Sequence, residues 1–183
     1  MGFDEIFATT VGLEGGYSDN PKDPGNWTGG KVGAGELKGT NFGISAASYP
    51  NLDIKNLTIS GAKAIYKSNF WDVLRLDEVS DNQIQDEIFD AGVNMGVAEA
   101  GIIVQRAIDF LEPGAPNFPL VIDGIIGAAT LSYIDSWIVK DLEALFKAID
   151  GFKFMRYVEI CYTTNKIFDW GWMKRIQEWK GSQ

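Results

Sequence analysis

The stretch Leu13-Glu14-Gly15-Gly16-Tyr17 marks the point at which an expected helix gives way to a glycine-rich loop. Before it, apolar residues recur at the three-to-four spacing that places side chains on one helical face, namely Phe3, Ile6, Phe7 and Val11. The pattern predicts a helix over residues 3–14. The glycine pair would end it, because glycine readily adopts the left-handed conformation that follows many helices.

Glu14 would then lie in the last turn of this helix. Free carbonyl groups there carry partial negative charge, so a carboxylate is disfavoured and the pKa of Glu14 should rise. A carboxyl group that keeps its proton near neutral pH can act as a general acid. The alternative is a solvated glutamate at a fraying helix end, and the spacing alone leaves both interpretations open.

A loop follows, because residues 18–28 are dense in turn-forming residues and have no helical period. It carries a second carboxylate, Asp23, and it is long enough to fold back toward the helix end. Two carboxyl groups that flank one cleft can hydrolyse a glycosidic bond. One protonates the leaving oxygen, and the other serves a water molecule or the developing cation.

Three motifs occur here in order: Glu14-Gly15-Gly16-Tyr17-Ser18, Asp23-Pro24-Gly25 and Thr40-Asn41-Phe42-Gly43-Ile44-Ser45. Together they resemble the signature of glycoside hydrolase family 108, and the resemblance continues through residues 66–71, 90–96, 123–130 and 171–176. It covers nearly the whole chain. Members of this family are N-acetylmuramidases of lysozyme type, found as bacteriophage endolysins and as bacterial proteins once labelled secretion activators.

The resemblance implies that Glu14 is the catalytic acid. By analogy with the Glu, Asp and Thr trio of phage lysozymes, Asp23 and a threonine would complete the site. The family pattern passes directly from a D-P-G-G turn to T-N-x-G-I-T, whereas this chain carries residues 26–38 in between. Two threonines therefore compete for one role. Thr40 lies in the matching motif and is preferred, with Thr28 as the alternative.

The inserted residues 26–38 are rich in glycine and suit an extended hairpin. It would be either a flap that grips substrate or a surface loop. Asp90 and Asn94, one helical turn apart, would either face the cleft or bind backbone amides. Trp172 is a further ring expected at a sugar groove, since flat amphipathic rings suit pyranose faces. The full set of expected substrate-binding residues is Tyr17, Trp27, Thr28, Asn41, Trp71, Asp90 and Asn94.

Composition limits the chemistry. The 183 residues include no histidine, which excludes Ser-His-Asp and Cys-His mechanisms and His-ligated zinc. The one cysteine, Cys161, lies in an apolar helical stretch, so no intramolecular disulfide or cysteine-rich metal site is possible, and a buried position is expected. We expect neither a metal nor a cofactor.

The rest of the chain is expected to form helices. One is expected to be capped by Ser60, and others should cover residues 82–95, 99–111, 128–139, 142–160 and 170–179. The expected class is mainly α, a lysozyme-like fold with a small β-hairpin lobe near residues 17–45. We expect a single domain, residues 1–183, in which residues 1–95 are catalytic. The helical residues 96–183 resemble a peptidoglycan-binding module, or they close the same domain, with Asp123 serving a turn.

The net charge of −9 disfavours nucleic acid and offers no long-range attraction to the anionic cell wall. Binding to a peptidoglycan glycan strand would need short-range contacts. The most apolar segment, residues 120–139, is interrupted by Asp123 and Asp135, so no membrane insertion is expected. The acidic N-terminus lacks a signal-peptide pattern. A monomer is expected in the host cytoplasm, reaching the wall after the membrane is permeabilised.

The expected activity is that of a phage endolysin that cleaves the β-1,4 bond between N-acetylmuramic acid and N-acetylglucosamine. A lytic transglycosylase, which needs one acid and yields a 1,6-anhydro product, is an alternative. A non-catalytic protein that binds the wall or assists secretion is another. Whether the mechanism is retaining or inverting depends on the carboxyl separation, about 5 Å or about 6.5–9.5 Å respectively.

Overall fold

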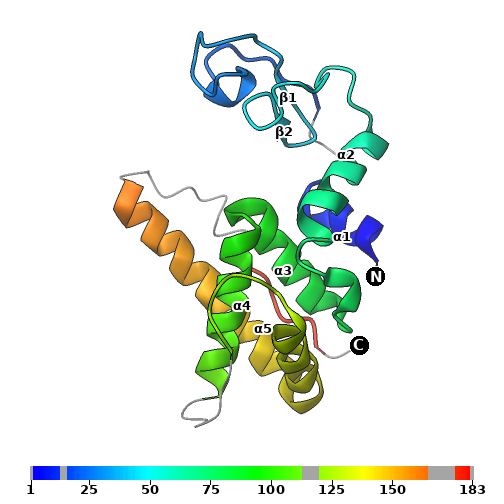
Figure 1. Ribbon diagram of the computed structural model, residues 1–183, viewed down its shortest axis with the longest axis vertical. Coiled ribbons are helices and arrows are strands. Elements are labelled where there is room, and N and C mark those ends of the chain that lie inside the picture. The colour runs from blue at the N-terminus through cyan, green and yellow to red at the C-terminus, as the bar shows by residue number, and fades with distance from the viewer. Residues whose placement is uncertain (1, 13–15, 113–119, 165–175, 182–183) are drawn as a thin grey trace. The chain divides into compact units, whose positions relative to one another are not determined.

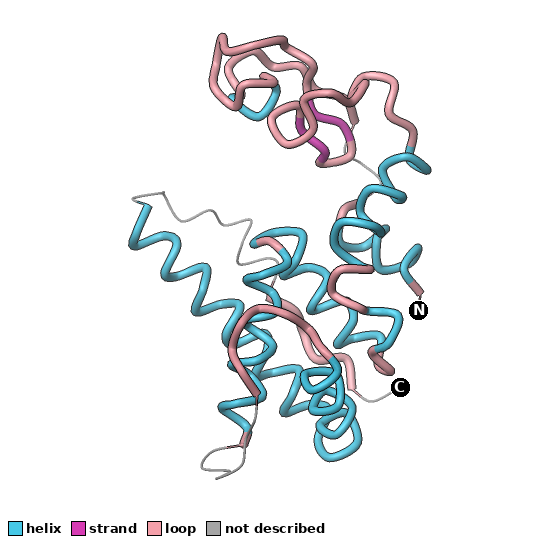
Figure 2. Tube along the Cα trace, viewed as in Figure 1, coloured by secondary structure: helices cyan, strands magenta, loops and turns pink. Residues whose placement is uncertain are grey.

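The computed structural model describes residues 2–12, 16–112, 120–164 and 176–181. The chain forms two compact units, Met1–Ser68 and Asn69–Gln183. Helices dominate, and the described residues contain one two-stranded antiparallel sheet (Figures 1 and 2). The mainly α class with a small β-hairpin lobe, expected from the sequence, is therefore confirmed, and it is consistent with a lysozyme-like fold.

Unit 1 begins with the helix α1, Phe3–Thr10. It ends earlier than expected, because Gly12 takes a left-handed conformation with φ of 76°. The prediction that this helix reaches Glu14 is therefore wrong. The Phe7 ring meets the edge of Tyr66 at a centroid distance of 5.4 Å, and this pair joins α1 to α2 in the core of the unit.

Helix α2 covers Ile59–Tyr66. Thr58 caps it in place of the expected Ser60, since the Thr58 hydroxyl oxygen accepts the N–H of Gly61 at 3.1 Å. A π-helical turn, Lys67–Trp71, follows directly.

The β lobe of unit 1 consists mostly of loops (Figure 2). Strand β1, Thr40–Asn41, pairs with β2, Ile44–Ser45, in antiparallel register. The two residues between them, Phe42 and Gly43, have φ of 50° and 75°. Positive values at both positions are typical of the type I′ turn that suits two-residue hairpins. Ser18 extends the pairing through backbone hydrogen bonds to Thr40 of 2.9 and 2.8 Å.

The described part of unit 2 contains a short 3₁₀ turn, Leu76–Glu78, and three helices that pack against one another: α3, Asn82–Met95, α4, Val97–Leu111, and α5, Ala128–Thr164 (Figure 1). The expected bounds of α3 are confirmed, and α4 begins two residues earlier than expected. Helix α5 is kinked at Asp141, whose φ is −164°. The Asp141 carboxylate accepts the N–H of Ala144 at 3.0 Å and so caps the second half, which explains why the sequence predicted two helices here.

The prediction of a C-terminal helix over residues 170–179 is wrong for its described part, because residues 176–180 have no helical structure. The backbone there bonds to α3 instead. Gln83 accepts the N–H of Lys180 at 3.2 Å and donates to the carbonyl of Gly181 at 2.8 Å. The Trp179 ring also packs on Phe146 at 5.3 Å.

Cys161 is partly exposed, which corrects the expectation of a buried position. Of the helices that the structure describes, none combines the length and the apolar character needed to cross a bilayer.

Candidate active site

The loop that precedes β1 is organised around Asn26, whose side chain is fully buried. Its amide nitrogen donates to the carbonyl of Asn20 at 3.1 Å, and its amide oxygen accepts the hydroxyl of Thr40 at 2.7 Å. Its backbone carbonyl accepts the N–H groups of Lys38 and Gly39, each at 3.0 Å. These four bonds tie together segments that are distant in sequence. An unpaired buried polar group would cost about 1–3 kcal/mol.

Asp23 lies at the surface of the same loop and begins a 3₁₀ turn, Pro24–Asn26. Its carboxylate accepts the N–H of Gly25 at 2.8 Å. Its backbone carbonyl accepts the N–H of Asn26 at 3.2 Å. Asn26 therefore joins the turn that carries Asp23 to the strand that carries Thr40.

The two candidate threonines have different hydrogen bonds. The Thr40 hydroxyl donates its proton to Asn26, which leaves its oxygen lone pairs available to accept a bond from water. The Thr28 oxygen already accepts the N–H of Glu36 at 2.9 Å within the inserted hairpin. This difference favours Thr40 as the residue that positions a water molecule.

Residues 27–37 form an internally hydrogen-bonded hairpin. Trp27 and Leu37 form an antiparallel bridge, and Gly29 donates to Ala34 at 3.0 Å. The Trp27 ring is partly exposed, and its indole N–H donates to the carbonyl of Pro21 at 2.9 Å. Its position beside the loop of Asp23 is compatible with a ring at a sugar groove, which stays a prediction.

Asn41 differs from its expected role, because it is only 6% exposed. Its amide nitrogen donates to the carbonyls of Ile54 and Leu57 at 3.2 and 3.3 Å. Its amide therefore holds the loop after β2 in place, and the prediction that Asn41 binds substrate is corrected.

Tyr17 is partly exposed and packs against Gly39, where an added Cβ would lie 2.7 Å from the ring. Partial burial, together with the negative charges of Asp19 and Asp53, raises the pKa of Tyr17 above its ordinary value. The phenol therefore keeps its proton at neutral pH and can donate a hydrogen bond.

Trp71, also expected at a sugar groove, is only 1% exposed. Its indole N–H donates to Asp77 at 2.7 Å, and its ring meets the edge of Phe89 at 5.6 Å. This corrects the expectation of sugar stacking, because a ring packed within the core offers no face to a pyranose.

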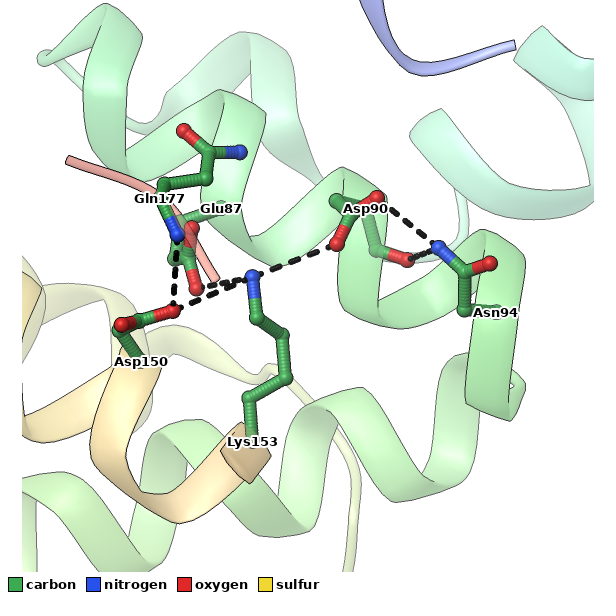
Figure 3. A network of polar contacts seen from close by, with 6 residues as sticks. All are labelled: Glu87, Asp90, Asn94, Asp150, Lys153 and Gln177. Carbon is green, nitrogen blue, oxygen red and sulfur yellow. Dashed lines mark hydrogen bonds and ion pairs between the residues drawn. The ribbon is translucent and has the colours of Figure 1, made fainter. Parts of the chain in front are cut away.

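Asp90 and Asn94 lie together on α3, as their spacing predicted (Figure 3). The Asn94 amide donates to the Asp90 carbonyl at 2.7 Å and to its carboxylate at 2.9 Å. Asp90 is 4% exposed and also lies 3.3 Å from the ammonium of Lys153, whereas Asn94 is exposed. Of this pair, only Asn94 has a surface position from which to meet a ligand.

Residues 7–96, which include the loop around Asn26 and all of α3, match the family described as Glycosyl hydrolase 108. This region of the chain belongs to glycosyl hydrolase family 108. The solved structure of Brucella abortus SagA is similar in fold, with a TM-score of 0.64 and 23% sequence identity over 95% of this chain and 88% of that one. No curated protein matches the sequence.

Two residues expected in the site of this glycosyl hydrolase, Glu14 and Trp172, lie outside the described residues. Since α1 ends at Thr10, the argument that a helix C-terminus raises the pKa of Glu14 does not hold. The assignment of Glu14 as the acid therefore depends on the family motif.

Asp123 serves a turn before α5, which is the simpler of its two expected roles. The side chain of Gln105, 1% exposed, accepts the N–H groups of Asp123 and Gly124 at 3.0 and 2.8 Å and donates to the Asp123 carboxylate at 2.9 Å. The bond that the Gln105 amide donates to the carboxylate, followed by the bond from the Ile125 N–H, lowers the pKa of Asp123. Gly101 lets this turn approach α4, because a Cβ there would lie 2.1 Å from the Gly124 carbonyl oxygen.

Sequence reasoning missed a buried charge network in unit 2. Lys153 on α5 and Glu87 on α3 are both 0% exposed and lie 2.5 Å apart (Figure 3). Asp90 and Asp150 also lie near the Lys153 ammonium, at 3.3 and 3.4 Å. The available signal was the position of Glu87 on the apolar face of α3, directly before Ile88. Among the described residues, His, Cys, Asp and Glu side chains form no group suited to a metal ion.

Three carboxyl groups therefore face one ammonium group in this network. Burial raises the pKa of Glu87 to about 8, although the positive charge of Lys153 opposes this effect. Burial alone would lower the pKa of Lys153, but Glu87, Asp90 and Asp150 outweigh it and hold that pKa above its ordinary range. At neutral pH, Lys153 is thus charged and Glu87 retains a proton.

We expect this proton to make stability fall as the pH rises. The pKa of Glu87 is higher in the folded chain, at about 8, than its ordinary value of 4.5. Between pH 4.5 and about 8, the carboxyl group of Glu87 is ionised in the unfolded chain but protonated in the folded chain. Its contribution to the free energy of unfolding is therefore fully present below the unfolded pKa, and it is lost as the pH rises through the folded pKa. Glu87→Gln, which stays neutral, should remove this loss, on the order of 3 kcal/mol.

The measurement is the free energy of unfolding in urea at pH 5 and pH 8.5. Relative to the wild type, Glu87→Gln should gain stability at the higher pH. Glu143→Gln makes the same substitution at an exposed position of α5 and should keep the wild-type dependence. Parallel pH profiles for the wild type and Glu87→Gln would show that no proton is held there.

Proposed function

We propose that the protein is an N-acetylmuramidase that hydrolyses the β-1,4 bond between N-acetylmuramic acid and N-acetylglucosamine. Membership of the family supports a peptidoglycan hydrolase. The observation that carries the proposal is that the family match covers the loop in which buried Asn26 joins the Asp23 turn to Thr40.

In this proposal Glu14 protonates the glycosidic oxygen as the bond breaks. The Asp23 carboxylate stabilises the developing cation or takes a proton from the attacking water. The Thr40 oxygen accepts a hydrogen bond from that water, because the Thr40 proton is already donated to Asn26.

The distribution of charge supports unit 1 as the unit that meets the wall. Unit 1 has six lysines against seven acidic residues, a net charge of −1, whereas unit 2 has ten basic against eighteen acidic residues, a net charge of −8. Salt screens charges over about 10 Å at 0.1 M ionic strength. The charge near the site therefore matters more than the total, and unit 1 presents little repulsion to an anionic polymer.

The proposal includes a lytic role of the endolysin type, in which the enzyme reaches the wall once the membrane is permeabilised. Residues 1–95 would carry catalysis within one lysozyme-like domain. Residues 96–183 would complete its helical region, and the turn role of Asp123 supports this over a separate wall-binding module.

We predict that the wild type clears a suspension of bacterial cell walls and that Glu14→Gln slows clearance by about 10²- to 10⁴-fold, because the amide cannot donate the catalytic proton. The measurement is the loss of turbidity with both proteins side by side. If neither protein clears the walls although both bind them, the non-catalytic alternative is correct.

The mass of the released fragments distinguishes the two enzymatic activities. A muramidase adds water and yields reducing N-acetylmuramic acid ends, whereas a transglycosylase leaves 1,6-anhydro ends. The proposal expects reducing ends only.

The two threonines can be separated by removal of each hydroxyl group. Thr40→Val should lower kcat/KM by about tenfold or more, because the water loses its acceptor and the Asn26 oxygen loses its donor. Thr28→Val should stay within about threefold of the wild type, since its hydroxyl only receives an exposed backbone N–H. Thr40→Ser, which keeps the hydroxyl group, is the matched control. A larger loss in Thr28→Val than in Thr40→Val would reverse the assignment.

A further inference from the structure

A pocket of about 330 Å³ lies on unit 1 beside the strand that carries Thr40. Its volume is within the range of about 300–1,000 Å³ that is usual for small-molecule sites. The pocket lining includes Tyr17, Leu37, Lys38, Leu52, Asp53 and Lys55. Tyr17 directly precedes Ser18, which pairs with Thr40, so the pocket adjoins the candidate active site.

The walls of this pocket are held in place by protein contacts. Asn41 binds the carbonyl of Ile54 at 3.2 Å, and the Lys38 ammonium donates to the carbonyl of Pro50 at 2.8 Å. On the other side, Tyr17 packs against Gly39. A ligand would therefore meet a preformed site, which reduces the ordering cost of binding.

The charged side chains that line the pocket differ in whether they have a close hydrogen-bond or ion-pair partner. Lys38 lies 3.4 Å from the Glu36 carboxylate, and Asp53 accepts the Asn56 amide at 2.9 Å. Lys55 is exposed and, among the described residues, has no ion-pair partner within 4.0 Å. The lining thus holds two ammonium groups, those of Lys38 and Lys55, against the one carboxylate of Asp53, so its net charge is +1, and Lys55 is the ammonium group without a described carboxylate within 4.0 Å.

Apolar surface adjoins this cation. Leu37 is 38% exposed and Leu52 is half-buried, so both can contact small aliphatic groups. A ligand that matches the pocket combines a carboxylate with methyl groups. The stem peptide of peptidoglycan, which is rich in alanine and carries free carboxylates, has this chemistry, whereas N-acetylglucosamine has no charge for Lys55 to meet.

We propose that this pocket binds the peptide stem of the glycan strand, with a stem carboxylate on Lys55 and alanine methyl groups on Leu37 and Leu52. The inference depends on the proposed function, because the stem is attached to the N-acetylmuramic acid at which cleavage is proposed. It adds a specificity determinant outside the residues that act on the glycosidic bond.

The test compares two substrates, glycan strands that carry their stems and strands freed of peptides by an amidase. Release of reducing ends gives kcat/KM for each. Lys55→Gln should lower kcat/KM about threefold to tenfold on the peptide-bearing strands, as expected for one charged contact near the surface. The same variant should leave hydrolysis of peptide-free strands unchanged. Lys147→Gln, with the same change of charge on an exposed position of α5, should alter neither rate.

Each outcome has a separate meaning. An equal fall of kcat/KM on both substrates would assign Lys55 to a sugar and overturn the inference, as would no fall on either. If the wild type releases reducing ends from neither substrate, the proposed muramidase function fails.

Discussion

Asn26 has no access to solvent, so every polar atom of its side chain must find a partner inside the β lobe. Its amide bonds to Asn20 on one side and to Thr40 on the other, and its carbonyl accepts two further N–H groups. The inserted hairpin begins directly after it and returns to it at Lys38. The hairpin can therefore form without separating the Asp23 turn from Thr40.

Charge imposes a second constraint, which differs between the two units. Unit 2 carries most of the excess negative charge and also places three carboxyl groups, two of them buried, around the buried Lys153. A buried ion is stable only when it is paired, so one of these carboxyl groups retains its proton. Unit 1 is nearly neutral, and Lys55 lines the pocket beside its candidate site. The unit expected to meet an anionic polymer is thus the one that repels it least.

The sequence predicted the features that depend on local pattern. Apolar periodicity located α3 and the two halves of α5, and the glycine-rich motifs located the β lobe. Prediction from the sequence failed where contacts with residues distant in the chain decide whether a side chain is buried or exposed. The end of α1 was missed for a different, local reason, since Gly12 takes the left-handed conformation before the glycine pair. Asn41, in contrast, was predicted to bind substrate, whereas its amide bonds to Ile54 and Leu57 in a later loop. Trp71 was likewise predicted to lie at a sugar groove, because the sequence does not distinguish an aromatic side chain packed in the core from one exposed in a groove.

The central claim is that the lobe held by Asn26 presents Asp23 and Thr40 to the glycan on the side opposite the acid Glu14. A crystal structure of the Glu14→Gln protein with a peptidoglycan tetrasaccharide tests it most directly. The account predicts a glycosidic bond bound between residue 14 and the Asp23 turn, with a water molecule on the Thr40 hydroxyl. A sugar chain bound only to unit 2, or a Thr40 hydroxyl remote from the scissile bond, would contradict it.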